Sequence, residues 1–271
     1  MTHTRSSLSA ILNQYDLAPS RALGQNFVVD PNTVRRIARL ARVQTGEFVL
    51  EIGAGLGSLT MALLETGATV EAMEIDRFLI GPLREVVEPL GAVVHHADAL
   101  TADYEAILLG RTAVLVANLP YNIATPLVLH LLETVPGITR MLVMVQLEVA
   151  ERLAAQASDE AYGAASVRVA YFAEAKVVGK VAASVFLPRP NVESALVEIT
   201  RRAQVAVPPS RVSEAAIFEV VRTAFSQRRK MLRRSLAGLL DEAAFARADV
   251  ASTRRPEELT LEEFARLAES R

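Results

Sequence analysis

Short apolar runs alternate with longer amphipathic stretches between residues 47 and 146 of the chain. Each run has the length of a buried strand, and each stretch between two runs has the length of a helix. Such alternation predicts a mostly parallel sheet covered on both faces, with a ligand site at the carboxyl ends of the strands. The predicted strands are Phe48–Ile52, Thr69–Met73, Ala92–Val94, Ala113–Ala117 and Ile138–Gln146.

Helix signals accompany the amphipathic stretches. Asp30 before Pro31 predicts an N-cap with proline at the first helical position. Gly81-Pro82 predicts an interruption in the fourth helix. Gly24–Phe27 forms a loop, for which a flap over a ligand and a plain connector both remain open. The predicted helices are 7–17, 31–42, Ser58–Glu65, Arg77–Glu88 and Leu147–Ala157.

The pattern changes towards the C-terminus. Glu174–Ala182 and Val192–Arg201 have the content of two further strands. The prolines of Val207–Ser210 predict a linker. We therefore expect an α/β domain over residues 1–206 and a small all-helical domain over residues 207–271. Its predicted helices are Ser213–Phe225, Arg229–Leu240 and Leu261–Glu269.

Four of the predicted strands deliver a glycine or a polar residue to their carboxyl ends: Gly53, Glu74, Asp98 and Asn118. The glycines of the first turn let the backbone approach a ligand, Glu74 can accept from both hydroxyls of a ribose, and Asp98 can accept from an adenine amine. A nicotinamide dinucleotide is a rival ligand, but its fingerprint has glycine where this chain has Ser58. The turn suits a nucleoside without a pyrophosphate better. A tight turn with ordinary surface acids is the remaining alternative.

The segment Asn118-Leu119-Pro120-Tyr121 follows the fourth apolar run. Pro120 fixes its own φ and pushes Leu119 away from helical angles, so that nearby backbone carbonyls face outwards. Acceptors beside an aromatic ring suit an amino group on an adenine, or less well a cytosine, taken out of a helix for chemistry. A Pro-Tyr turn after a buried strand is the alternative, because short motifs give false positives.

Composition narrows the class of protein. The chain of 271 residues is 51% hydrophobic, which excludes a mainly disordered protein. No apolar run reaches membrane-spanning length, and the N-terminus lacks the apolar stretch of a signal peptide, so we expect a cytoplasmic protein. The absence of cysteine and the spacing of the four histidines predict no metal site.

These motifs resemble the S-adenosylmethionine-dependent rRNA adenine dimethyltransferases over about residues 21 to 260. The resemblance is strongest to the KsgA-type branch, which modifies two adjacent adenines near the 3′ end of small-subunit rRNA. It implies a Rossmann-like class I methyltransferase fold with a seven-stranded sheet. The matching segments are Gly24–Phe27, Glu51–Gly57, Glu74–Asp76, Asp98-Ala99, Asn118–Ile123, Gln146–Arg152, Tyr162–Val167, Phe186–Ala195 and Phe225–Lys230.

The resemblance also implies roles for individual residues. Asn118, Leu119, Pro120 and Tyr121 would form the catalytic segment. S-adenosylmethionine would be the cofactor, and the residues expected to bind it are Asn26, Val28, Gly53, Glu74, Asp98 and Asn118. Phe186 would supply a second face of the base sandwich, although a core phenylalanine is the simpler interpretation of this residue from sequence.

Basic residues gather in one part of a chain whose net charge is −2. No acid lies within residues 220 to 234, and we expect this basic strip to contact rRNA phosphates within a pre-ribosomal particle, although a solvated helix face is the usual alternative. A monomer without metal or membrane contact is expected. The strip comprises Arg222, Arg228, Arg229, Lys230, Arg233 and Arg234.

Two other functions remain open. A resistance methyltransferase that acts on large-subunit rRNA, or another adenine methylase, is the second hypothesis, and the rRNA that accepts methyl groups would distinguish it. A non-catalytic RNA-binding factor on the same fold is the third hypothesis. The intact segment Asn118–Tyr121 argues against this factor, because such a protein is expected to have lost its acceptor pocket.

Overall fold

The computed structural model describes residues 2–20 and 22–271, which form two compact units. The first unit consists of Met1–Ala150 and Lys176–Thr200, and the second of Glu151–Ala175 and Arg201–Arg271. Residues 151–175 thus group with the C-terminal helices, whereas the expected boundary after residue 206 assigns them to the first domain. The functional division into 1–206 and 207–271 stays a prediction.

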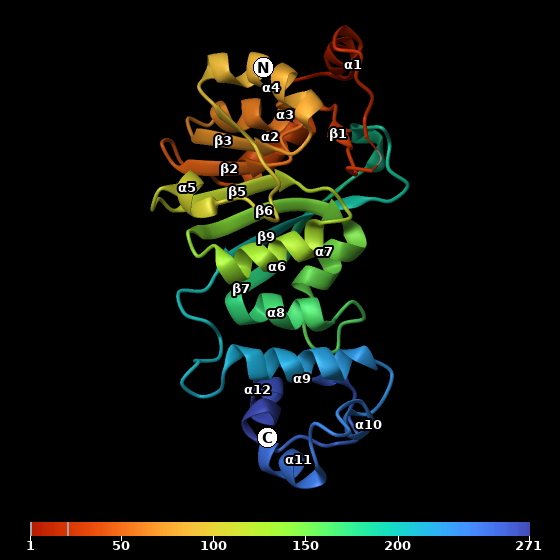
Figure 1. The fold of residues 1–271 in the computed structure, drawn as a ribbon. Helices are drawn as coiled ribbons and strands as arrows, with labels where there is room; N and C mark the ends of the chain where they lie inside the picture. Colours follow the sequence, from red (N-terminus) through yellow and green to blue (C-terminus); the bar gives the residue numbers. More distant parts are fainter. Residues whose placement is uncertain (1, 21) are drawn as a thin grey trace. The chain divides into compact units, whose positions relative to one another are not determined.

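A seven-stranded sheet in the order β4-β3-β2-β5-β6-β9-β7 is the framework of the fold (Figure 1). β2 to β6 pair in parallel, and β9 pairs antiparallel to β6. The expected Rossmann-like, mostly parallel sheet is therefore confirmed. The strands are β2 (Phe48–Ile52), β3 (Thr69–Glu74), β4 (Val93–His96), β5 (Ala113–Asn118), β6 (Ile138–Gln146), β7 (Ala173–Val181) and β9 (Ser194–Arg201).

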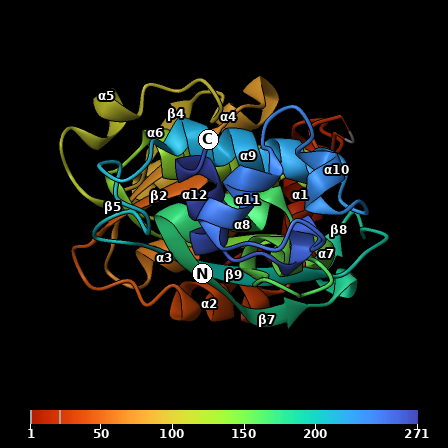
Figure 2. The same ribbon diagram turned by 90° about the horizontal axis from the view of Figure 1, so that it is seen from below.

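Helices flank the sheet, and Figure 2 shows α2 and α6 on opposite sides of it. The Asp30 side chain caps α2 by accepting from the backbone N–H groups of Asn32 and Thr33, as the sequence predicts. The helices up to residue 154 are α1 (Arg5–Gln14), α2 (Pro31–Leu40), α3 (Ser58–Leu64), α4 (Arg77–Val87), α5 (Tyr104–Leu108), α6 (Ala124–Thr134) and α7 (Leu147–Ala154). The 3₁₀ turn η1 (Glu88–Leu90) follows α4, and the 3₁₀ turn η2 (Ala183–Val185) follows β7.

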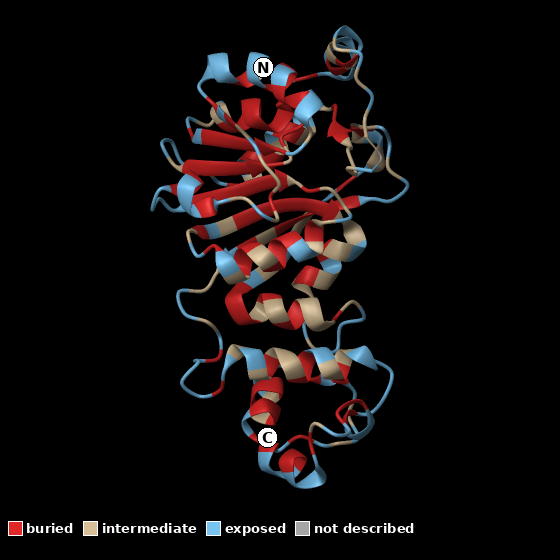
Figure 3. Ribbon diagram, viewed as in Figure 1, coloured by how far each residue is buried: buried red, intermediate tan, exposed pale blue. Residues whose placement is uncertain are grey.

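The core lies on the central strands, which are coloured as buried in Figure 3. Every residue of β2 is buried, as is every residue of β5 before Asn118. Covering both faces of a sheet removes the alternation of polar and apolar residues. This is why the sequence shows these strands as continuous apolar runs.

Separately, β1 (Phe27–Val28) and β8 (Phe186–Leu187) form a small antiparallel pair. Val28 lies opposite Phe186 in this pair. The pair joins the loop after α1 to the segment that follows β7. Two segments far apart in the sequence are thereby held together.

The regular elements of the second unit are helices, apart from the first residues of β7 and the last residue of β9. Its central helix, α9, packs against α8, α10 and α12. The ring of Phe225 on α9 lies 6.0 Å from that of Tyr162 and 5.9 Å from that of Phe264, centroid to centroid. The helices are α8 (Ala164–Phe172), α9 (Glu214–Ser226), α10 (Leu232–Ser235), α11 (Glu242–Ala248) and α12 (Leu261–Glu269), with the 3₁₀ turn η3 (Pro256–Glu258).

Two expected helices were wrong in detail. α4 continues through Pro82 without interruption. Pro82 has no N–H to donate within α4, and the apolar side of this helix packs against the sheet. The helix expected over Arg229–Leu240 is reduced to α10, because Gln227–Lys230 form a turn and the N–H groups of Leu232 and Arg233 donate to the carbonyls of Arg254 and Ser252.

Candidate active site

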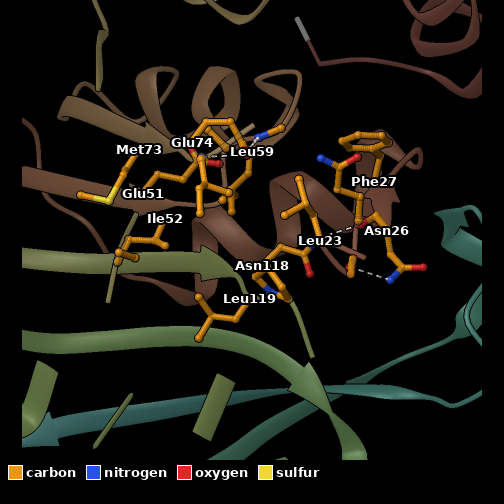
Figure 4. Close-up of a pocket in the computed structure, with 18 of the residues that line it drawn as sticks. Leu23, Asn26, Phe27, Glu51, Ile52, Leu59, Met73, Glu74, Asn118 and Leu119 are labelled. Carbon is orange, nitrogen blue, oxygen red and sulfur yellow. Dashed lines mark hydrogen bonds between the residues drawn. The ribbon is translucent and has the colours of Figure 1, made fainter. Parts of the chain in front are cut away.

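One pocket lies at the carboxyl ends of the strands, where the strand order reverses between β2 and β5. Figure 4 shows side chains from these strand ends and from the 23–28 segment around it. Ligands bind at this position in open α/β sheets. All residues predicted to bind cofactor or take part in catalysis line the pocket: Asn26, Val28, Gly53, Glu74, Asp98, Asn118, Leu119, Pro120 and Tyr121. The structure thus brings them together, while their roles remain predictions.

Glu74 ends β3 and is buried. Its Oε2 accepts from the backbone N of Gly55 at 2.8 Å, and its Oε1 accepts from the backbone N atoms of Ile75 and Asp76 at 3.0 and 2.9 Å. Burial raises the pKa of Glu74, and these three N–H donors oppose that rise. The carboxylate therefore ties the end of β3 to the glycine turn and lies at the pocket.

The glycine turn after β2 is tightly enclosed. Gly55 has φ +59°, and an added Cβ would lie 2.9 Å from the Phe27 ring. Gly57 has φ +82°, and an added Cβ would lie 2.5 Å from Cγ1 of Val87. A side chain at either position would combine backbone strain with a steric clash. The turn is therefore packed between the 23–28 segment and α4.

Glu51 is a pocket residue to which the sequence analysis assigned no role. It is 1% exposed, and the hydroxyl of Thr60 donates to its Oε2 at 2.5 Å. Burial raises the pKa of Glu51 to about 8; the Thr60 bond opposes this rise, and the nearby Glu74 carboxylate adds to it. A lone acid inside an apolar strand was the available signal, since buried acids are rare unless they are paired.

The segment after β5 is held in a turn by three hydrogen bonds. The Asn118 Nδ2 donates to the backbone oxygen of Asn26 at 2.9 Å, the Leu119 N to Met144 O at 3.1 Å, and the Ile123 N to Pro120 O at 3.2 Å. Within the part of the chain that the structure describes, the Asn118 Oδ1 has no hydrogen-bond partner. That oxygen is available to a ligand. The backbone oxygen of Asn118 lies close to Gly53, at 3.4 Å from a Cβ added there.

Tyr121 is anchored through its hydroxyl, which lies 2.7 Å from the Oγ of Ser194 at the start of β9. Burial raises the pKa of Tyr121, and the bond to Ser194 opposes the rise. The sequence analysis did not single out Ser194, because the two residues meet only through the sheet. The Phe186 ring is fully buried in the core, which confirms the interpretation of Phe186 as a core residue.

Gly24–Phe27 line the pocket, and a role of this segment as a flap over a ligand stays a prediction. The Gln25 side chain accepts from the backbone N of Ser20 at 2.7 Å and donates to Oδ2 of Asp76 at 2.8 Å. The Asn26 Nδ2 donates to the backbone oxygen of Gly24 at 3.0 Å. The segment is therefore bonded to itself, to Ser20 and to Asp76, the N-cap of α4.

The six residues of the predicted basic strip are all exposed. Arg222 lies on α9, Arg228–Lys230 on the turn after it, and Arg233 and Arg234 on α10. Arg228 donates to the backbone oxygen of Glu160 at 2.5 Å. Among the described residues no acidic side chain forms a salt bridge with any of the six, so their charges face solvent.

Neither a metal cluster nor a membrane span is found in the described part of the chain. No group of three or more histidine, cysteine or acidic side chains there could hold a metal ion. None of the described helices is both long and apolar enough to cross a bilayer. The pocket at the sheet edge is therefore the site whose chemistry has to be explained.

Comparison with known proteins agrees with this geometry. The model of the ribosomal RNA adenine dimethylase family matches residues 19–270. The ribosomal RNA small subunit methyltransferase A of Streptomyces coelicolor is 48% identical, over 93% of this chain and 90% of that protein. The protein of the same name from Thermobifida fusca is 44% identical, over 99% and 96%.

A solved structure gives a similar result. The 23S rRNA methyltransferase ErmE is 28% identical with a TM-score of 0.71, and the match covers 90% of this chain and 98% of ErmE. The matches thus extend over both compact units. The chain belongs to the ribosomal RNA adenine dimethylase family and is an rRNA methyltransferase.

Proposed function

We propose that this enzyme uses S-adenosylmethionine to dimethylate two adjacent adenines near the 3′ end of small-subunit rRNA, within a pre-ribosomal particle in the cytoplasm. The relatives named small subunit methyltransferase A, at 44% and 48% identity, support the small subunit as target. The large-subunit alternative has weaker support, because ErmE is 28% identical. A non-catalytic role is disfavoured by the intact acceptor segment after β5.

The charge of the pocket is the observation that carries the cofactor assignment. The carboxylates that line it are those of Glu74 and Asp98, Glu51 adds a buried carboxyl group whose pKa is raised to about 8, and the described lining residues include no lysine, arginine or histidine. S-adenosylmethionine carries a sulfonium, an ammonium and one carboxylate, so its net charge is positive and this lining attracts it. A dinucleotide would instead bring a pyrophosphate into an acidic pocket, which agrees with the glycine spacing that disfavours this ligand.

The residues fit the parts of this cofactor. A carboxylate offers about four acceptor sites, so Glu74, which already receives three backbone N–H bonds, keeps about one site for a ribose hydroxyl. Asp98 receives one bond, from the backbone N of Leu100 at 2.9 Å, and keeps acceptor capacity for an adenine amine. Gly53 would face the methionine moiety, and Asn26 and Val28 would close the pocket beside it.

The cofactor supplies a methyl group on a sulfonium, and the protein has to align and desolvate the attacking amine. The Asn118 Oδ1 and a neighbouring backbone oxygen can accept the two N–H groups of an adenine amine. Asn118 is neutral, so it orients the amine without adding a buried charge. A monomethylated amine keeps one N–H for the second transfer. Tyr121 would stack on the base, with its ring fixed by Ser194.

The second compact unit would dock on rRNA. It carries 16 basic against 14 acidic residues, whereas the first unit carries 13 against 17. The six exposed cations of the basic strip suit phosphate contacts, which position a protein without reading sequence.

Transfer of tritiated methyl groups to small-subunit precursor particles, followed by mapping of dimethyladenosine, tests the function. We expect label on two adjacent adenines near the 3′ end of the small-subunit rRNA. Label on large-subunit rRNA alone would favour the resistance-type activity instead. Particles that bind the enzyme but accept no label would contradict the proposed target.

A further inference from the structure

Glu51 and Glu74 lie on adjacent strands and enter the same pocket (Figure 4), but their oxygens are differently occupied. Glu74 receives three backbone N–H bonds, on both oxygens. Glu51 receives one bond, from Thr60 to Oε2. No described residue donates to its Oε1. Glu51 is therefore a buried carboxyl group with one oxygen left for a proton or a ligand.

The surroundings of Glu51 contain no compensating cation among the described residues. On β3 the facing charged group is Glu74, an anion. The neighbouring end of β5 contributes Ala117 and the neutral Asn118, and α3 contributes the hydroxyl of Thr60. A carboxylate here is disfavoured both by burial and by a like charge. In the free protein the Glu51 side chain is thus best accommodated as a neutral acid.

We propose that Glu51 binds the cationic amino-acid end of the cofactor and releases its proton to solvent as the cofactor binds. This inference rests on the proposed cofactor. Glu51 lies two residues before Gly53, which is expected to face the methionine moiety. The O–H bond of the Glu51 carboxyl group breaks, the electron pair stays on oxygen, and the buffer takes the proton. An ammonium or sulfonium then replaces the proton as the partner of the carboxylate.

The affinity for the cofactor should increase as the pH rises towards 8. The pKa of Glu51 is about 8 in the free protein, so the group is protonated at and below neutral pH. A bound cation lowers this pKa, because an opposite charge favours the ionised form. Raising the pH towards 8 therefore removes the proton that competes with binding. Affinity should rise from about pH 6 to about pH 7 by up to about tenfold per pH unit, a range in which the α-amino group of the cofactor keeps its charge.

Calorimetric titration of the full-length protein with S-adenosylmethionine at about pH 6 and about pH 7 tests this, because α-amino groups stay charged below about 7.7. Repeating each titration in two buffers of different ionisation enthalpy counts the protons released. We expect tighter binding at the higher pH and release of up to about one proton. The neutral sulfide 5′-methylthioadenosine, which lacks the cationic end, should bind without releasing a proton.

Two variants refine the test. Glu51→Gln keeps the shape of the neutral acid and should abolish both the pH dependence and the proton release. Glu71→Gln changes another buried acid of the sheet, one that pairs with Arg111 and His95 and lies outside the pocket; it should behave as the wild type. Equal proton release from the wild type and Glu51→Gln would overturn this inference but not the cofactor assignment. Equal release from the wild type on binding S-adenosylmethionine and 5′-methylthioadenosine would have the same meaning. Failure of the wild type to bind S-adenosylmethionine at any pH would overturn the cofactor assignment with it.

Discussion

The polar residues of the pocket differ in the hydrogen bonds that they already make within the protein. Glu74 has three donors from the backbone, which keep its carboxylate in place as a fixed acceptor. Asn118 uses its amide nitrogen to bind Asn26, which orients the amide oxygen for a ligand. Because an unpaired buried polar group costs free energy, a ligand that satisfies these acceptors gains affinity.

Replacing Glu74 by alanine should weaken S-adenosylmethionine binding by about 10- to 100-fold, since hydrogen bonds to charged groups contribute about 1.5–3 kcal/mol. Glu74→Gln retains the packing and should lose less affinity. Calorimetry on folded protein gives the answer, with Glu88→Ala, an exposed acid outside the pocket, as control. Unchanged affinity in a folded Glu74→Ala protein would contradict the ribose assignment.

Asn118→Ala should reduce methyl transfer more than it reduces cofactor or RNA binding, because its acceptor acts mainly when the amine is positioned for attack. Tyr121→Ala should behave in the same way through lost stacking. Single-turnover transfer and filter binding separate the two effects. Asn13→Ala, an exposed asparagine on α1, is the matched control. Wild-type turnover in either pocket variant would mean that the acceptor site lies elsewhere.

At the scale of secondary-structure elements, the main feature is the packing of one turn against two neighbouring elements. The turn between β2 and α3 contacts the Phe27 ring on one side and α4 on the other. Its glycines have positive φ, at which a Cβ would strain the backbone, and at Gly55 and Gly57 a Cβ would also collide with these neighbours. The position of the cofactor-binding turn is therefore fixed by elements that are distant in the sequence.

Gly57→Ala should destabilise the protein by about 1–3 kcal/mol and weaken cofactor binding, because the added methyl group would lie against Val87 in addition to straining φ. Gly91→Ala is a matched control: Gly91 also has positive φ, but nothing lies within 4 Å of an added Cβ. Urea unfolding should show a smaller loss for Gly91→Ala. Equal losses for both variants would show that strain alone, and not the contact with α4, fixes the turn.

Charge distribution is the feature that matters for the whole molecule. A net charge of −2 gives little long-range attraction to RNA, whereas affinity for nucleic acid comes largely from neutralised phosphates. A pre-folded particle offsets this by presenting an ordered RNA surface, so less ordering opposes binding. The basic strip is then sufficient as a docking surface.

Small-subunit precursor particles should accordingly be methylated far better than protein-free rRNA at matched salt. Changing Arg228 and Arg229 to glutamate should abolish docking but leave cofactor affinity unchanged. Arg35 and Arg39, exposed on α2, give a control double reversal of the same charge that should keep activity. Tritiated methyl transfer measures all three proteins. Equal rates on particle and naked RNA, or full activity after reversal of the strip, would show that the target hairpin alone is recognised.

The amino-acid sequence alone determined the order and type of most elements, because burial on both faces leaves continuous apolar runs. β2 and β6 were predicted with the bounds that the structure has. The convergence of Gly53, Glu74, Asp98 and Asn118 also followed, since parallel strands end at one edge of a sheet. Local signals were sufficient for these features.

Only the tertiary structure decided features that depend on distant partners. Arg228–Lys230 lie in a turn and not a helix because the backbone of residues 252–254 takes the N–H groups at the start of α10. Ser194 meets Tyr121 because β9 lies beside β6 in the sheet. The pKa of Glu51 is raised because burial and the neighbouring Glu74 outweigh one hydroxyl bond. None of these pairings leaves a local pattern, since each joins segments whose proximity the fold alone creates.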